Sequence, residues 1–106
     1  MKILLDVCTP VQVRKALPTH EVHTAVKMEW GELENGELLS VAESAGFELL
    51  IICDKNMRYQ QNLKGRKLAI LELWTNHRPT LEKHLNLINT TANLVRPGEY
   101  RVLSEP

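Results

Sequence analysis

The sequence predicts a single α/β domain over residues 1–106, a three-layer α/β/α sandwich with a mainly parallel central sheet. Two observations predict this class of fold. The segments 3–5 and 47–53 are almost purely apolar, as strands covered on both faces of a parallel sheet are. Strand-like and helix-like segments also alternate along the chain, which is typical of parallel strands joined by right-handed crossovers.

The first part of the chain reads as strand, helix and strand. A strand is expected at 2–6, where an apolar run ends in an acid. Thr9 and Pro10 then read as an N-cap and the first residue of a short helix, which Pro18 ends. The segment 21–26 is rich in β-forming residues and alternates weakly, so it predicts the second strand.

The middle of the chain predicts a helix between two turns. A loop is expected at 28–34, and Asn35 is a suitable N-cap for a helix over 36–45 that Gly46 ends. The apolar positions of this helix fall on one face and are Leu38, Leu39, Ala42 and Ala45. The third strand follows at 47–53.

The last part predicts a polar loop, a strand, a long helix and a strand. The loop is expected at 54–66 and the fourth strand at 67–74. Pro79 opens the strongest helical pattern, whose apolar positions at alternating spacings of four and three are Leu81, Leu85, Ile88, Ala92 and Val95. After a Pro-Gly turn at 97–98, a last strand is expected at 100–103.

Composition limits the classes of partner and compartment. Thirteen basic and thirteen acidic residues cancel, so the chain has no global field that attracts nucleic acid, and such binding needs a local patch. No apolar run is long enough to cross a bilayer, and an acid follows the first five residues too early for a signal peptide. Two cysteines do not form a disulfide scaffold. We expect a cytoplasmic protein without a membrane partner.

Two aspartates follow the two most apolar strands. Asp6 ends the first, and Asp54, with Asn56 two residues later, follows the third. Ligands of open α/β sheets bind beyond the carboxyl ends of the strands, and close carboxylates need a cation to compensate their charge. Mg²⁺ or Mn²⁺ on these oxygens can activate water against a phosphodiester. The alternative is that both aspartates cap helices or satisfy turns.

Glu37 is a candidate for a third catalytic carboxylate beside Asp6 and Asp54. It lies in the first turn of the helix expected at 36–45, so it can point toward the strand ends or complement the helix dipole as a solvated residue. Glu32 and Glu34, in the preceding loop, are weaker candidates.

The polar loop predicts an RNA-binding segment. It has five basic residues between 55 and 67, no acid after Asp54, and a tyrosine and amides among the cations. Such side chains contact phosphates, stack on bases and bind base edges. The candidate RNA-binding residues are Lys55, Arg58, Tyr59, Gln60, Gln61, Asn62 and Arg66. The alternative is a solvated loop whose amides bind its own backbone.

Cys8 and Cys53 form a rival pattern. Each thiol lies within two residues of a candidate acid, so a soft-metal or redox site is conceivable if the two strands are neighbours. The alternative is that both are small packing residues, and no Cys-x-x-Cys spacing supports the rival.

The chain resembles small PIN-like proteins, a family of nuclease type, over nearly its whole length. The segments that carry the resemblance are MKILLD at 1–6, LPTHEVHT at 17–24, WGELENGELL at 30–39, DKN at 54–56, YQQNL at 59–63, GR at 65–66 and PG at 97–98. The resemblance implies a PIN-like sandwich and cleavage of single-stranded RNA by acids around Mg²⁺ or Mn²⁺. It implies that Asp6 and Asp54 are site acids, with Asn56 beside them. Toxin-type relatives are often encoded beside an antitoxin protein and often form homodimers, which implies both as further partners.

The chain departs from the family pattern at two positions. Val7 stands where relatives have glutamate, and Cys53 stands where they have threonine or serine. Two functions therefore stay open. The first is a metal-dependent endoribonuclease, with the toxin of a toxin-antitoxin pair as one form of it. The alternative is a degenerate, non-catalytic PIN-like domain that binds RNA or a protein partner.

Overall fold

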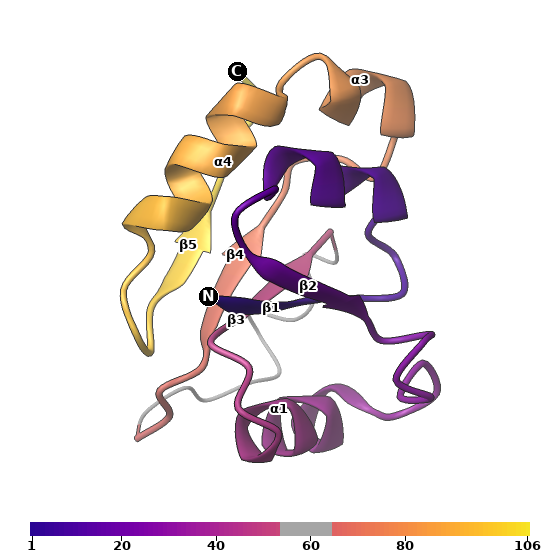
Figure 1. The fold of residues 1–106 in the computed structure, drawn as a ribbon, viewed down its shortest axis with the longest axis vertical. Helices are drawn as coiled ribbons and strands as arrows, with labels where there is room; N and C mark the ends of the chain where they lie inside the picture. Colours follow the sequence, from indigo (N-terminus) through magenta and orange to yellow (C-terminus); the bar gives the residue numbers. More distant parts are fainter. Residues whose placement is uncertain (54–64) are drawn as a thin grey trace.

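The computed structural model describes residues 1–53 and 65–106, and within them the chain forms one five-stranded sheet (Figure 1). The strands lie in the order β2-β1-β3-β4-β5, and every neighbouring pair is parallel. Their bounds are β1 (Lys2–Leu5), β2 (Glu21–Thr24), β3 (Leu49–Ile52), β4 (Ala69–Glu72) and β5 (Tyr100–Val102). The helical elements are η1 (Val11–Ala16), α1 (Asn35–Ser44), α3 (Arg78–Glu82) and α4 (Leu85–Leu94).

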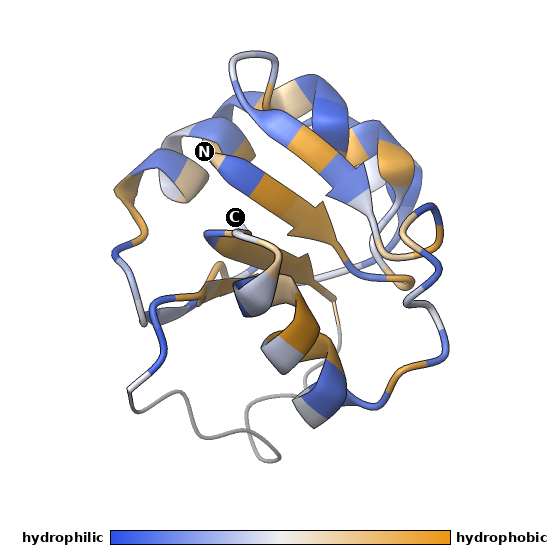
Figure 2. Ribbon diagram, turned by 60° about the horizontal axis from the view of Figure 1, so that its bottom comes forward, coloured by the Kyte–Doolittle hydropathy of each residue, from blue (hydrophilic) through white to orange (hydrophobic). Residues whose placement is uncertain are grey.

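Helices cover both faces of the sheet, so the expected three-layer α/β arrangement is confirmed. In Figure 1, α1 lies on one side of the strands, and η1, α3 and α4 lie on the other. Side chains alternate along each strand, so Ile3 and Leu5 join the core under η1, α3 and α4, whereas Leu4 joins the core under α1. Figure 2 shows the central strands as almost continuously apolar ribbons, as burial on both faces requires.

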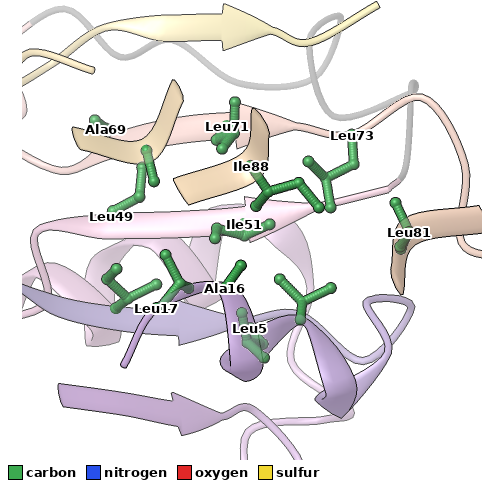
Figure 3. Close-up of a cluster of buried hydrophobic side chains, with 13 residues drawn as sticks. Leu5, Ala16, Leu17, Leu49, Ile51, Ala69, Leu71, Leu73, Leu81 and Ile88 are labelled. Atoms are coloured by element: carbon green, nitrogen blue, oxygen red, sulfur yellow. The ribbon is translucent and has the colours of Figure 1, made fainter. Parts of the chain in front are cut away.

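The larger core lies on the side of η1, α3 and α4 (Figure 3). It joins strand residues such as Ile51 and Leu71 to Leu17, Leu81 and Ile88 from the covering segments. Leu5, Ile51, Leu71 and Ile88 are each fully buried, so this layer ties both ends of the chain to the sheet. None of the helices in residues 1–53 and 65–106 has the length and hydrophobicity of a membrane span.

The strand order creates a topological switch between β1 and β3. The chain leaves β1 through η1 to reach β2 on one side, and then passes through α1 to β3 on the other side of β1. The strand order therefore reverses its direction between β1 and β3. Open α/β sheets bind ligands in a crevice at such a switch, which makes the ends of β1 and β3 the candidate site.

The first helix is a 3₁₀ helix, and the expectation that Thr9 caps it is wrong. The Thr9 hydroxyl donates to the carbonyl of Ile51 at 3.0 Å instead, and η1 has no side-chain cap. The seven residues between Pro10 and Pro18 leave little room for an α-helix. The 3₁₀ form places Val13 and Ala16, three residues apart, on one buried face.

The single helix expected after Pro79 is divided in two. The N–H of His84 donates to the carbonyl of Leu81 at 3.0 Å, a tight bond that ends α3, and α4 begins at Leu85. The ring of His84 packs edge-on against Trp74, with 5.5 Å between the ring centroids. The apolar spacing in the sequence runs through this break because Leu81 of α3 and Ile88 of α4 both pack in the same core.

Several further boundaries differ from the expected ones, and two of these differences have a clear local description. Glu34 precedes α1 as its N-cap and Asn35 is already helical, so Asn35 is not the cap. The strand expected at 21–26 ends at Thr24, because the carbonyl and hydroxyl of Thr24 accept the N–H groups of Met28 and Lys27 and turn the chain.

Candidate functional site

Asp6 lies at the carboxyl edge of the sheet, directly after β1. Its N–H donates to the carbonyl of Ile51 at 3.0 Å, so pairing with β3 continues through this residue. Its own carbonyl accepts the N–H of Thr9 at 3.0 Å and starts the turn into η1. Alternation along the strand directs Asp6 to the same face as Leu4, the face that α1 covers.

Glu72 is a second carboxylate at this edge, and the sequence reasoning missed it. It is the last residue of β4, it is 1 % exposed, and within residues 1–53 and 65–106 it is the one buried charged side chain. The hydroxyl of Tyr100 in β5 donates to its Oε1 at 2.7 Å. A glutamate inside the otherwise apolar run of 68–73 was the signal in the sequence that could have found it.

The sheet register places Asp6 and Glu72 in one row on either side of β3. Leu5 pairs with Ile51 and Ile52 pairs with Glu72, so Asp6 is level with Ile52 on one side and Glu72 is level with it on the other. Both carboxylates influence the thiol of Cys53. Burial is the main reason why the pKa of Cys53 is raised to about 11, and the charges of Asp6 and Glu72 raise it further.

Asp54 and Asn56 lie outside the described residues, so the structure does not test their convergence with Asp6. The strand that precedes them is described. β3 ends at Ile52, between Asp6 and Glu72, two residues before Asp54 in the sequence.

Glu37 is not brought to the strand ends. Leu38, Leu39 and Ala42 form the buried face of α1, and Glu37 falls on the opposite side of the helix, where it is exposed. Asn35, at the start of α1, shares the buried face instead, because it is three and four residues before Leu38 and Leu39. Asn35, and not Glu37, therefore shares the face of α1 that packs on the sheet.

The expected RNA-binding segment is described only at its end. Lys55, Arg58, Tyr59, Gln60, Gln61 and Asn62 lie outside the described residues. Arg66 lies at the opposite, amino edge of the sheet, three residues before β4. Its guanidinium donates to the Ser40 hydroxyl at 3.3 Å and lies 3.9 Å from a carboxylate oxygen of Glu43, so it is engaged with α1. The structure does not bring Arg66 and Asp6 together.

The thiols of Cys8 and Cys53 lie near the candidate acids, and neither forms a disulfide bond within the described residues. Cys8 is exposed and Cys53 is half-buried, with its Sγ 3.6 Å from the Thr9 hydroxyl. The proximity of Cys8 also contributes to the raised pKa of Cys53. A thiol of this kind is protonated at neutral pH, which disfavours it as a soft-metal ligand.

Among the described residues, the carboxyl edge offers few hard oxygen donors to a metal ion. Within residues 1–53 and 65–106, no three His, Cys, Asp or Glu side chains are grouped to hold a metal ion. The described donors are the two carboxylates of Asp6 and Glu72, which suit Mg²⁺ or Mn²⁺ but do not form a complete site by themselves.

A separate, mostly apolar cavity of about 370 Å³ lies at the amino edge of the sheet. Its walls include Phe47, Leu49 and Ala69, and the charged side chains that line it are Glu43, Glu48, Lys67 and Arg96. The strands begin at this edge, so the cavity is remote from Asp6 and Glu72. We call this hollow the amino-edge cavity.

Comparisons with known proteins assign no family. No protein-family model matches the chain, and neither the curated proteins nor the solved structures include a significant match. The fold and the acids at the carboxyl edge therefore carry the argument about function.

Proposed function

We propose that this chain is a metal-dependent ribonuclease of PIN-like type that cleaves single-stranded RNA at the carboxyl edge of β1, β3 and β4. Asp6, Asp54 and Glu72 would hold Mg²⁺ or Mn²⁺, with Asn56 beside them. The observation that carries the proposal is the row of Asp6 and Glu72 on either side of the strand that leads into Asp54. This row coincides with the topological switch, where α/β sheets of this order bind ligands.

The chemistry of the side chains supports a hard divalent cation at this edge. Glu72 is almost fully removed from water, and its carboxylate accepts a hydrogen bond from the Tyr100 hydroxyl. A second carboxylate, Asp6, lies in the same row on the other side of β3, and carboxylate oxygens are ligands that Mg²⁺ and Mn²⁺ prefer.

The side chains have distinct tasks in this proposal. When bound, the metal ion would activate a water molecule and neutralise charge on the phosphoryl oxygens. Asp6 and Glu72 supply negative charge and oxygen donors from opposite sides of β3. Tyr100 orients the carboxylate of Glu72 through its 2.7 Å hydrogen bond, as second ligand layers commonly do.

One observation favours a second function, a non-catalytic domain that binds RNA or a protein partner. Val7, where the resembled family has glutamate, is 46 % exposed, and Glu37 faces away from the sheet, so the site lacks two acids that an active nuclease of this type would use. Glu72 makes up for one of these missing acids, because it adds a carboxylate at the same edge of the sheet. The first proposal extends to a toxin of a toxin-antitoxin pair. Its partners would then be an antitoxin protein and a second copy of this chain.

Cleavage of an unstructured RNA in Mn²⁺ tests the proposal. Asp6→Asn and Asp54→Asn are expected to abolish cleavage, and Glu72→Gln is expected to lower Mn²⁺ affinity by about tenfold or more. Glu48→Gln, an exposed acid at the amino edge, is the matched control and should cleave normally. Cleavage that survives both aspartate changes would refute the proposal. RNA binding without cleavage, together with no Mn²⁺ binding in calorimetry, would favour the non-catalytic domain.

A further inference from the structure

We propose that single-stranded RNA passes from Asp6 over Val7 and Val26 and continues in a groove along β2, where Arg14 and Lys27 contact its phosphates. The inference rests on the proposed nuclease function and names the surface that binds its substrate. A polymer is longer than the row of acids that would cut it, so the strand must cross a neighbouring surface. The side of β1 and β2 offers such a surface.

The groove, called the β2-edge groove here, is a hollow of about 350 Å³ between η1 and β2. It is lined by Val11, Arg14, Val22, His23, Thr24 and Lys27. Because η1 starts at the carboxyl edge and β2 ends there, the groove opens toward the edge that carries Asp6. No carboxylate is among the side chains that line it in the described part of the chain.

The two cations are held at the wall and rim of this groove. One guanidinium nitrogen of Arg14 donates to the carbonyl of Val22 at 3.3 Å, which lays the side chain against the outer strand and uses one of its five N–H donors. Lys27 lies on the turn after β2, where its N–H donates to the Thr24 hydroxyl at 3.1 Å. Both side chains are exposed, so phosphates can reach them.

The acid of β2 is already engaged by a neighbour. Glu21 accepts a hydrogen bond from the ring of His23 at 2.8 Å, and this bond is the main reason why the pKa of Glu21 is lowered. The Glu21 carboxylate is therefore hydrogen-bonded within β2, and among the described residues no ion pair joins it to Arg14 or Lys27.

An apolar surface connects Asp6 to the groove. Val7 follows Asp6 directly and is 46 % exposed, and Val26 is 67 % exposed. Both lie around Gly31, because a Cβ there would be 3.2 Å from Cγ1 of Val7 and 3.9 Å from Cγ2 of Val26. The missing side chain leaves the valine methyl groups open to a flat apolar group such as the face of a base.

Charge favours RNA over a protein partner as the occupant. Exposed valines alone would suit either, but two cations without a lining carboxylate match a phosphate backbone. The chain has no net charge, so a local pair of cations decides where a polyanion can bind. Arg66 does not compete for this role beside Asp6, because it lies at the opposite edge and is engaged with Glu43.

Fluorescence anisotropy with a labelled, unstructured RNA tests this inference without metal, in EDTA, so that binding is measured apart from cleavage. The Arg14→Glu, Lys27→Glu double variant is compared with Lys67→Glu, Arg96→Glu, which makes the same charge change at the amino-edge cavity. The groove variant is expected to bind at least about tenfold more weakly, and its salt dependence should fall by about 1.4 in slope. Val7→Ser, Val26→Ser should weaken binding without changing the slope.

Several outcomes overturn the inference. Equal losses in both double variants would show unspecific charge attraction, and unchanged affinity in the groove variant would exclude the groove. Binding of an acidic peptide through Arg14 and Lys27, without RNA binding, would assign the groove to a protein partner. Circular dichroism and thermal melting confirm that each variant is folded.

The outcome for the groove is separable from the outcome for the nuclease. If wild type cleaves RNA and the Arg14→Glu, Lys27→Glu variant cleaves with unchanged KM, the groove is refuted while the nuclease stands. If RNA binding depends on the groove but no Mn²⁺-dependent cleavage occurs, the groove stands and the nuclease is refuted.

Discussion

Glu72 and Tyr100 show how parallel pairing can place a buried acid beside a suitable donor. β5 pairs with β4 so that Ile70 is opposite Tyr100 and Glu72 is opposite Val102. The long tyrosine side chain spans this offset along the sheet, and its hydroxyl reaches Oε1 of Glu72 at 2.7 Å. The acid is thereby kept at the edge of the sheet with a defined orientation.

The two cysteines should differ strongly in reactivity. Burial is the main cause that raises the pKa of Cys53 from 9.0 to about 11, so at pH 8 about a hundredfold less thiolate forms there than in a thiol with the ordinary value. Iodoacetamide at pH 8 is expected to modify exposed Cys8 first and Cys53 very slowly, with the Cys53 rate still rising above pH 10. Mass spectrometry of peptides measures both rates. Equal rates at pH 8 would contradict the buried position of Cys53, and Zn²⁺ protection of both would revive the soft-metal alternative.

At the scale of elements, a turn fixes how β5 joins the sheet. The N–H of Gly98 donates to the carbonyl of Lys67 at 3.0 Å, and Gly98 has φ of +77°. A Cβ at this position would lie 2.8 Å from the backbone carbonyl oxygen of Arg66, which cannot move easily. The turn therefore needs glycine for its conformation and for its close approach to the segment before β4.

Gly98→Ala should destabilise the protein more than Gly46→Ala. Both positions have positive φ, which costs a residue with a side chain about 1–2 kcal/mol, but Gly46 has open space around its missing Cβ. Gly98→Ala adds the contact with the Arg66 carbonyl, so its loss in free energy of unfolding should exceed that of Gly46→Ala. Urea denaturation measures both losses, and equal values would show that the turn adapts.

Glu43 links α1 to the start of β4. Its Oε1 accepts the N–H groups of Leu68 at 3.1 Å and Lys67 at 2.7 Å, and these bonds lower its pKa below the ordinary 4.5. A lowered pKa means that the ionised carboxylate stabilises the folded state above pH 4.5. This stabilisation is lost as the pH falls through the folded-state value.

Thermal melting against pH tests this link. Glu43→Gln should melt below wild type at pH 7, because the neutral amide accepts these hydrogen bonds less strongly than a carboxylate does. The difference between the two proteins should shrink as the pH falls below 4.5. A difference that is constant from pH 7 to pH 3 would show that the charge of Glu43 does not matter. Glu48→Gln, an exposed acid nearby, is the control.

At the scale of the whole molecule, the sheet separates two edges with different chemistry. The carboxyl edge has Asp6, Glu72 and the end of β3. The amino edge has the mostly apolar amino-edge cavity, whose charged side chains, Glu43, Glu48, Lys67 and Arg96, have both signs. Net charge is zero, so each edge acts through its local groups. The proposed metal and RNA sites both belong to the carboxyl edge and to the groove that opens from it.

Mn²⁺ should stabilise the folded protein through the carboxyl edge. An ion that binds the folded state alone, at a hundred times its Kd, adds about 2.7 kcal/mol to the free energy of unfolding. Urea denaturation followed by circular dichroism measures this gain, with KCl of equal ionic strength as the reference. Asp6→Asn should show little of the gain and Glu48→Gln should show all of it. A gain that both variants keep would place the ion elsewhere.

Local patterns in the sequence were sufficient to predict much of the fold. The apolar runs around Leu4 and Leu50 predicted two buried strands, and the spacing in 36–45 predicted α1, because burial and periodicity are recorded in neighbouring residues. The position of Asp6 at the end of β1 followed in the same way. These features depend on short stretches of chain and need no knowledge of strand order.

Only the tertiary structure decided which side chains meet. The order β2-β1-β3-β4-β5 placed Glu72 in the row of Asp6, the buried face of α1 turned Glu37 outward, and β4 carried Arg66 to the opposite edge. The break between α3 and α4 also depends on packing at His84. Pairing between distant strands sets each of these positions, and distant pairing leaves no mark in the local period of the sequence.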